Sequence, residues 1–470
     1  MKPHDQPSHV GRPSSREAAT PPVLTEAIGP LRALWRALVV FGTLLIMCLS
    51  VGLDRLGLYR VGRWMLGRSG VRLSWARALR EAFEFLGPTY IKFGQIIASS
   101  EGLFSREMSE EFRLCLDQVP PVPFAVTRRS IETDFQRPLE EVFTCIAQEP
   151  LAAASIAQVH LAQLKDGRAV VVKVQRPGLA RVVGADLRVM LFFTGLLERC
   201  SYRARMGNLV GIVEDFVCTL TQEMDFRLEG LNMDEFNDLL SDVPGNRVVA
   251  PRVHWDFTSP RVLTMEQFHG WRVDDVRKMS EMEDTEDELI VGVLAWMRTL
   301  LEAGVFHGDM HAGNLMYLED GRIGFLDFGI VGRLEAGQRD QAMGFLLSLA
   351  TGNFREFARI VWSMSRANDE VDLDVLAVDL KEAYEPLTRG DMGSLDYQQV
   401  LPGIERSGLK HGIKFPKEFT LITKQLLYFD RYARLLAPRL NFFTDPRITS
   451  QIVGMLPHIS RPPATLAQPA

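Results

Sequence analysis

The sequence predicts an α+β fold in which a small lobe containing β-strands precedes a larger helical lobe. Two β-rich runs between residues 156 and 174 enclose an Asp-Gly turn, the pattern of a hairpin. From Leu289 onward, long apolar stretches follow a helical period, and a shorter pair of strand-like runs brackets the turn at Asp320-Gly321. The stretch before the hairpin, residues 74–137, is expected to be a helical extension closed by prolines.

Length and composition exclude several classes of protein. A chain of 470 residues has room for about three structural units, and 24% charged with 46% apolar residues is typical of globular proteins. The formal net charge of -6 lacks the basic excess that binding to a phosphate backbone requires, so nucleic acid is not expected as a partner. Five scattered cysteines without a C-x-x-C pair favour reduced thiols over a disulfide framework or a zinc site.

Two segments are expected before the extension. Residues 1–30 are rich in Pro, Ser and Thr without a hydrophobic period, which predicts a disordered tail. Residues 31–58 contain an uncharged run from Ala37 to Leu53 that would reach about 25 Å as a helix, just short of a bilayer core. This segment is predicted to be a transmembrane or membrane-associated helix; a buried hairpin helix and a signal-peptide core are the alternatives.

The charges beside this apolar run predict its orientation. Arginines are denser on its C-terminal side, at positions 55, 60, 63 and 68, and the positive-inside rule then places the main body in the cytoplasm. Three acidic residues in the tail, Asp5, Glu17 and Glu26, argue against a mitochondrial transit peptide and favour a bacterial source. The expected location is the inner, cytoplasmic membrane, with the folded body facing the cytoplasm.

The strongest chemical signal is the stretch H-G-D-M-H-A-G-N at residues 307–314, followed by Asp327-Phe328-Gly329. Two carboxylates and an amide at this spacing form the oxygen set that holds Mg²⁺ on nucleotide phosphates and orients a nucleophile. Asp309 is the candidate base, and Asn314 and Asp327 are the candidate metal ligands. An isolated Asp-Phe-Gly would be only a turn, and His307 is expected to hold the loop through hydrogen bonds of its ring.

A lysine and a loop in the hairpin region fit the same chemistry. Lys173 lies in V-V-V-K-V on the second strand, where an ammonium among apolar neighbours needs a carboxylate partner. A glycine-rich loop does not precede this hairpin. Alanines take up positive φ less easily than glycine, so the loop should close differently on a nucleotide. Its residues are Ala152, Ala153, Ala154 and Ser155.

From about Leu86 to Pro446 the chain resembles the UbiB/AarF family of atypical, protein-kinase-like proteins. Several motifs carry this resemblance. They are Lys92-Phe93-Gly94-Gln95 (the family's K-x-G-Q), the alanine-rich loop, Lys173 to Gly178, Glu223-Met224-Asp225 (E-x-D) with Glu229 after it, and Val262 to Glu266 (the hinge strand). Two departures are Gly308 and Ala312, where the family often has alanine and proline, and Ala98 to Gly102, where it commonly has S-x-R-x-D.

The resemblance implies a bilobal protein-kinase-like fold that binds ATP or ADP with Mg²⁺. The implied domains are the extension at 74–137, a small lobe with a helical insert at 138–270, a large helical lobe at 271–446 and a tail at 447–470. Lys92 would reach the nucleotide cleft and contact Glu223 and Asp225, with Glu223 at or near a helix start. Glu229 would pair with Lys173, and the segment ending at Glu266 would contact the nucleotide.

The resemblance also implies a function, a membrane-associated kinase or ATPase that supports isoprenoid-quinone lipid biosynthesis. Its partners would be the bilayer, a lipid or isoprenoid-quinone precursor, and quinone-biosynthesis proteins. Soon after Gly329 the chain is expected to enter a helix without an A-P-E motif, so a platform for peptide docking is missing. The alternatives are a small-molecule phosphotransferase of the aminoglycoside or choline kinase type, which needs neither alanine loop nor lysine extension, and a non-catalytic nucleotide-binding scaffold.

Overall fold

The computed structural model describes most of the chain. The described residues are 30–56, 74–99, 105–114, 120–202, 205, 209–280, 285–364, 371–388, 403–404, 406–408, 410–413, 415–437, 440–441, 443 and 445–459. The tail expected at 1–30, apart from Pro30, and the arginines at 60, 63 and 68 therefore lie outside the described residues. Within these ranges helices and strands are both present, and the predicted α+β class is confirmed.

The chain divides into two compact units. Unit 1 comprises Met1–Leu228 and Val253–Gln267, and unit 2 comprises Glu229–Arg252 and Phe268–Ala470. This division differs from the expected one, because the extension and the first strands share a unit while residues 229–252 belong with the helical lobe. The reason is local: the segment 248–249 adds a strand to the sheet of unit 2.

An antiparallel sheet forms one part of unit 1, in the order β1-β3-β4-β6 with β2 beside β3. The expected hairpin is confirmed as β3 and β4, joined at a turn in which Gly167 has a φ of 90°. Alternate side chains of β3 are buried, as a sheet with one covered face requires. The bounds are β1 Phe143–Ile146, β2 Ala152–Ala153, β3 Ala157–Leu164, β4 Ala169–Gln175 and β6 Val262–Glu266. The helices α7 (Phe124–Phe135) and α8 (Leu139–Val142) adjoin the sheet.

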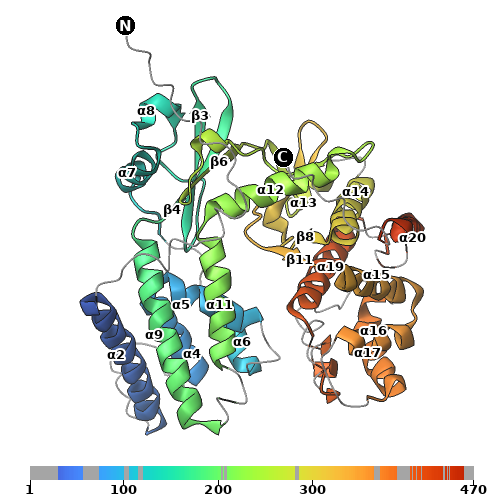
Figure 1. The fold of residues 1–470 in the computed structure, drawn as a ribbon, viewed down its shortest axis with the longest axis horizontal. Coiled ribbons are helices and arrows are strands. Elements are labelled where there is room, and N and C mark those ends of the chain that lie inside the picture. The colour runs from blue at the N-terminus through green and yellow to red at the C-terminus, as the bar shows by residue number, and fades with distance from the viewer. Residues whose placement is uncertain are drawn as a thin grey trace, which may run out of the picture. The chain divides into compact units, whose positions relative to one another are not determined.

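A group of helices forms the other part of unit 1 among its described residues (Figure 1). They share an apolar core to which the predicted extension contributes Phe83, Tyr90 and Phe112. Ser74 caps the first helix of the extension by accepting a hydrogen bond from the backbone N–H of Arg77. The bounds are α2 Pro30–Arg55, α4 Trp75–Leu86, α5 Pro88–Ser99, α6 Arg106–Phe112, α9 Leu179–Cys200 and α11 Leu209–Glu223.

Helix α2, which contains the apolar N-terminal segment, packs on α4 and α9 (Figure 1). Val40, Met47 and Val51 lie on its buried face. Arg36 donates a 3.0 Å hydrogen bond to the fully buried carboxylate of Asp186 on α9. An isolated buried carboxylate is costly, so this ion pair ties the N-terminal helix to the body of unit 1.

Two small sheets lie in unit 2. One has the order β5-β10-β9-β7, in which β5 is parallel to β10 and the other pairs are antiparallel, and the other pairs β8 with β11. The strand pair predicted around the turn at Asp320-Gly321 is confirmed as β9 and β10. The bounds are β5 Val248–Val249, β7 Gly270–Arg272, β8 Val305–His307, β9 Leu315–Leu318, β10 Ile323–Phe325 and β11 Val331–Arg333.

Helices make up most of unit 2. The helix expected soon after Gly329 is present as α15, whose start is closed by a capping box between Glu335 and Gln338. It begins at Ala336, later than expected, because Gly332 and Arg333 belong to the strand β11. Helix α12 begins in unit 1 and runs into unit 2. The bounds are α12 Phe226–Ser241, α13 Val276–Ser280, α14 Thr285–Arg298, α15 Ala336–Thr351, α16 Phe354–Met364, α17 Leu373–Thr388, α19 Lys417–Leu436 and α20 Pro446–Ile459.

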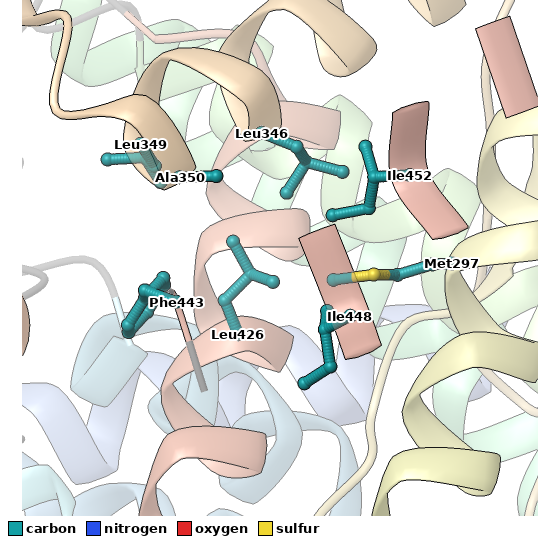
Figure 2. Close-up of a pocket in the computed structure, with 8 residues that line it drawn as sticks. All are labelled: Met297, Leu346, Leu349, Ala350, Leu426, Phe443, Ile448 and Ile452. Carbon is teal, nitrogen blue, oxygen red and sulfur yellow. The ribbon is translucent and has the colours of Figure 1, made fainter. Parts of the chain in front are cut away.

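The segment expected to be a tail from 447 forms helix α20 instead, up to Ile459. Its Ile448 and Ile452 are buried and face a small apolar pocket (Figure 2). The other lining residues come from the helices and the segment around it: Met297, Leu346, Leu349, Ala350, Leu426 and Phe443. Burial of its isoleucines against these side chains stabilises the helix.

Candidate active site

The motif at residues 307–314 forms the loop that joins β8 to β9 in unit 2. His307 is the last residue of β8, and a 3-10 turn, Ala312–Asn314, leads directly into β9. At the start of that turn the ring of His311 accepts a 3.0 Å hydrogen bond from the N–H of Gly313. The loop is therefore held at both ends by strands and inside by its own side chains.

The His307 ring lies buried beneath the loop and joins it to the Asp-Phe-Gly segment. Its Nδ1 accepts a 3.1 Å hydrogen bond from the N–H of Asp309, so Nε2 carries the proton that it donates to the carbonyl of Leu326 at 2.9 Å. The ring also meets the edge of Phe328, with centroids 4.7 Å apart. Burial lowers the pKa of His307, which keeps the ring neutral. The expected holding role of His307 fits these contacts.

The backbone of Gly308 lies against Ile330. Its N–H donates a 2.9 Å hydrogen bond to the carbonyl of Ile330, and a Cβ at Gly308 would lie 2.8 Å from Cγ2 of that isoleucine. With isoleucine at position 330, the place where the family often has alanine requires glycine. Gly308, where the sequence departs from the family pattern, therefore leaves the space that the side chain of Ile330 occupies.

Asp309 lies at the centre of the loop, with about a quarter of its side chain exposed. Its Oδ1 forms an ion pair with Nζ of Lys424 at 2.9 Å, while its Oδ2 is 3.8 Å from Nε2 of His311. The side-chain amide of Asn314 donates a 2.9 Å hydrogen bond to the backbone carbonyl of Asp309. That bond fixes the orientation of the amide, so the Asn314 oxygen remains the group that can bind a cation.

Asp327 follows β10 and has an unusual backbone conformation. Its φ of 57° lies in the left-handed region, which among non-glycine residues aspartate tolerates best together with asparagine. Its Oδ1 accepts a 3.2 Å hydrogen bond from the N–H of Gly329, while the buried ring of Phe328 packs on Phe236. The N–H of Leu326 donates a 2.8 Å hydrogen bond to the carbonyl of Asn314, so the two candidate metal ligands lie on hydrogen-bonded segments.

These donors suit Mg²⁺ better than a transition metal. No group of three His, Cys, Asp or Glu side chains that could hold a metal ion exists among the described residues. Mg²⁺ in nucleotide sites is held by one or two protein oxygens together with phosphates and water, and Asn314 and Asp327 supply such oxygens. The residues present thus fit a nucleotide-bound Mg²⁺.

Helix α19 supplies site residues that sequence reasoning missed. Gln425 accepts a 2.7 Å hydrogen bond from the N–H of Met310 and donates one to the carbonyl of Gly308, also at 2.7 Å. The hydroxyl of Tyr432 donates a 2.8 Å hydrogen bond to the carbonyl of Met310. One signal was available in the sequence: polar residues such as Gln425 and Asp430 interrupt the apolar face of this helix, and both are buried.

In unit 1, Lys92 of α5 forms a 2.9 Å ion pair with Glu223, the last residue of α11. The expectation that Glu223 lies near a helix start is therefore wrong. The chain breaks after α11, and Asp225 stands before α12, where its carboxylate accepts a hydrogen bond from the N–H of Arg227 and pairs with that guanidinium at 2.6 Å. Because α11 ends at Glu223 and α12 begins at Phe226, Glu223 and Asp225 do not lie on one continuous helix.

Lys173 lies on β4 with Val159 and Leu263 as its strand neighbours. Its Nζ is 5.4 Å from the centre of the Phe226 ring. Glu266 ends β6 on the neighbouring strand of the same sheet. The expected ion pair between Lys173 and Glu229 would join the two units and stays a prediction.

The alanine-rich loop continues the sheet of unit 1. Ala152 and Ala153 form β2 and pair with β3, and Ser155 is buried. The N–H of Ala154 donates to the carbonyl of Ala157 at 2.9 Å, and its carbonyl accepts from Nε of Arg176, also at 2.9 Å. Among the described residues, the non-glycine positions with positive φ are Gln136 and Asp327, so these alanines avoid the conformations that glycines would adopt.

Comparison with known proteins places these features in a family. The family model described as the ABC1 atypical kinase-like domain matches residues 114–361. An uncharacterized aarF domain-containing protein kinase of Arabidopsis thaliana, named as chloroplastic, is 38% identical, covering 79% of this chain and 74% of the relative. A Pseudomonas fluorescens protein named Probable protein kinase UbiB is 30% identical, covering 81% of this chain and 72% of the relative.

A solved structure supports the fold. The Mycobacterium tuberculosis protein Rv3197, determined in complex with erythromycin, aligns with a TM-score of 0.54 at 24% sequence identity. The alignment covers 78% of this chain and 92% of the other. The likeness confirms the predicted kinase-like fold.

The buried neutral ring of His307 predicts a pH dependence of stability. Its pKa is lowered in the folded state, whereas the unfolded ring has a pKa of about 6.5. Below that pH the unfolded chain binds more protons, so the free energy of unfolding falls as the pH decreases. Thermal unfolding of wild type and His307→Gln is measured at pH 7.5 and at pH 5.5. Between these pH values the free energy of unfolding should fall by about 1 kcal/mol more in the wild type than in the variant. All other histidines are common to both proteins, so equal losses would contradict a neutral His307.

Proposed function

Because the chain belongs to the ABC1 atypical kinase-like family, we propose that it is a membrane-associated kinase or ATPase that binds Mg-ATP or Mg-ADP. The observation that carries this proposal is the loop of unit 2, where Asp309, Asn314 and Asp327 lie on hydrogen-bonded segments. Their oxygens have the chemistry that phosphoryl transfer needs: a base for the nucleophile and hard ligands for a metal ion.

Each residue has a separate task in this proposal. Asn314 and Asp327 would hold Mg²⁺, which when bound neutralises negative charge on the phosphate oxygens. Asp309 orients the attacking hydroxyl or water and accepts its proton. His307 contributes indirectly, since its ring fixes both the backbone of Asp309 and the carbonyl before Asp327.

The proposed substrate class is a lipid of isoprenoid-quinone metabolism rather than a peptide. Only residues 330–335, which include the three-residue strand β11 and the capping residue Glu335, separate the Asp-Phe-Gly segment from α15, so the long activation segment on which protein kinases dock peptides has no place there. The family resemblance supplies the quinone connection, with quinone-biosynthesis proteins as proposed partners at the inner membrane.

Two alternatives make different predictions. A small-molecule phosphotransferase would release or transfer phosphate with a soluble acceptor and without lipid. A nucleotide-binding scaffold would bind Mg-nucleotide and release no phosphate. Measuring phosphate release from Mg-ATP with and without lipid extracts separates both from a lipid-linked kinase or ATPase.

Replacing Asp327 tests the metal assignment. Asparagine keeps the size of the side chain and its tolerance of positive φ but removes the charge that attracts Mg²⁺. Asp327→Asn should abolish the Mg²⁺-dependent increase in melting temperature that nucleotide produces in the wild type. Asp320→Asn, at the exposed turn between β9 and β10, is the matched control and should keep the full increase. Unchanged stabilisation in Asp327→Asn would show that the metal is bound elsewhere.

Lys92 supports a role for the extension in this function. Its ammonium pairs with Glu223 at 2.9 Å in a partly buried setting, with side-chain exposures of 25% and 11%. Lys92→Ala would leave that acid without this partner, while Asp309, Asn314 and Asp327 belong to unit 2. We expect the variant to lose lipid-linked function and to keep nucleotide binding with altered selectivity or turnover.

The measurements are complementation of a quinone-deficient strain and nucleotide titration of the purified protein. Arg77→Ala, which removes an exposed i,i+4 ion pair with Glu81 on α4, is the control and should complement. Full complementation by Lys92→Ala would reject a functional role for the extension. Complete loss of nucleotide binding would identify Lys92 as a direct phosphate ligand instead.

Helix α2 is the proposed membrane anchor. Its stretch Leu34–Arg55 is 22 residues long with a mean hydropathy of 2.2, long and apolar enough to cross a membrane. The face opposite the Arg36 ion pair leaves large apolar side chains exposed: Leu31, Leu34, Trp35, Leu38, Phe41, Leu45, Ile46, Leu49 and Leu53. An exposed apolar surface of this extent is typical of contact with lipid or protein. We assign it to the bilayer.

Substitutions on the exposed face test this anchor better than deleting the helix, because deletion would also remove the partner of the buried Asp186. The triple variant Phe41→Ser, Leu45→Ser, Leu49→Ser should move most of the protein from the membrane pellet to the soluble fraction without lowering its melting temperature by more than a few degrees. Serines at the exposed Val375 and Val378 of α17 provide the control. Complete retention of the triple variant in the pellet would show that another surface binds the membrane.

A further inference from the structure

Lys424 of α19 contacts Asp309, in the loop that joins β8 to β9, from 115 positions away in the sequence. Its Nζ lies 2.9 Å from Oδ1 of Asp309, and about a third of the lysine side chain is exposed, 34%. Neither the loop motif nor any motif of the family resemblance includes this residue. The proposed function gives Asp309 the central chemical task, so a charged side chain in direct contact with it has consequences for that task.

The contact between Lys424 and Asp309 is built into the fold. The next residue, Gln425, is hydrogen-bonded to the backbone on both sides of Asp309, at Gly308 and Met310, and Tyr432 bonds Met310 two turns further along the helix. These three bonds set the position of α19 along the loop. Lys424 therefore approaches Asp309 from a fixed backbone position and is not a surface side chain that meets it by chance.

The ammonium of Lys424 is charged in this setting. Burial alone would lower the pKa of Lys424, but the carboxylate of Asp309 and the hydroxyl of Tyr428 offset burial and the pKa is raised. The ring of Tyr428 adds a cation–π contact, with its centre 5.6 Å from Nζ. A cation held at this place attracts one carboxylate oxygen and limits rotation of the aspartate.

The two oxygens of Asp309 consequently differ. Oδ1 is occupied by the ammonium of Lys424. Among the described residues, the side-chain group that faces Oδ2 is Nε2 of His311, which at 3.8 Å is too distant for a hydrogen bond. Oδ2 is thus the oxygen that remains able to accept a proton from an incoming hydroxyl.

We propose that Lys424 is a positioning residue for phosphoryl transfer, which holds Oδ1 of Asp309 so that Oδ2 is the proton acceptor. This inference rests on the proposed function. In the step it supports, the attacking oxygen forms a bond to the γ-phosphorus and passes its proton to Oδ2. The bond from the γ-phosphorus to the bridging oxygen breaks, and ADP leaves with that electron pair. If the side chain of Asp309 could rotate, its acceptor oxygen would face the attacking hydroxyl in a smaller fraction of the bound complexes.

Two variants of Lys424 separate positioning from folding. Methionine keeps the length of the side chain without the charge, and arginine keeps the charge with a different shape. With Mg-ATP and vesicles of phosphatidylethanolamine and phosphatidylglycerol, Lys424→Met should lower the kcat of phosphate release about 10- to 100-fold. KM for ATP should stay within about twofold of the wild-type value, because the metal ligands are unchanged. For the same reason, Mg-nucleotide should raise the melting temperature as it does in the wild type. Lys424→Arg should recover part of the lost kcat. Lys417→Met, an exposed lysine at the start of the same helix, should behave as wild type.

A double variant tests whether Lys424 acts through Asp309. If it does, Lys424→Met should cause no further loss of kcat in an Asp309→Asn background. An additional loss there, an unchanged kcat in the single variant, or a raised KM with normal kcat would each overturn the proposal. An inactive wild type would overturn the proposed function and this inference together, whereas an active wild type with a fully active Lys424→Met would overturn this inference alone.

Discussion

The backbone of the loop between β8 and β9 must be hydrogen-bonded inside an apolar unit, and the arrangement of unit 2 depends on this constraint. A buried N–H or carbonyl without a partner costs about 1–3 kcal/mol, and the loop from Gly308 to Asn314 follows no regular ladder that would satisfy these groups. Partners come instead from three directions. They are the ring of His307 below the loop, the backbone of Ile330 beside it, and the side chains of Gln425 and Tyr432 from α19. The loop, the Asp-Phe-Gly segment and α19 are thereby joined into one arrangement that presents Asp309, Asn314 and Asp327.

A second polar contact organises the N-terminal part of unit 1. Arg36 of the apolar helix α2 has its partner, the buried Asp186, on α9. One face of the helix is thus committed to the protein while the other carries exposed leucines and aromatic residues. Burial raises the pKa of Asp186, and the guanidinium opposes that shift. The helix therefore has the two faces that a protein-attached anchor needs.

Local patterns in the sequence predicted a large part of the fold and of the site. The β3–β4 hairpin and the β9–β10 pair were predictable because a glycine turn between short apolar runs is a signal contained in about twenty residues. The loop motif likewise brought together Asp309 and Asn314, whose 2.9 Å contact depends on five residues of chain. The position of Glu223 was predicted wrongly, since it ends α11 instead of lying near a helix start. The break between α11 and α12 depends on how these helices pack and has no clear signal in residues 223–225.

The sequence by itself determined the α+β class, the motifs of a kinase-like protein, the strand around Lys173 and the apolar N-terminal helix, since each depends on residues close together in the chain. Only the tertiary structure decided that Lys424 meets Asp309, that Arg36 meets Asp186, and that residues 446–459 form helix α20, which packs around an apolar pocket (Figure 2). The physical reason is the same in each case. Two residues more than a hundred positions apart are brought together by the packing of whole helices, which buries apolar surface wherever it can and leaves no record in the local pattern of either residue.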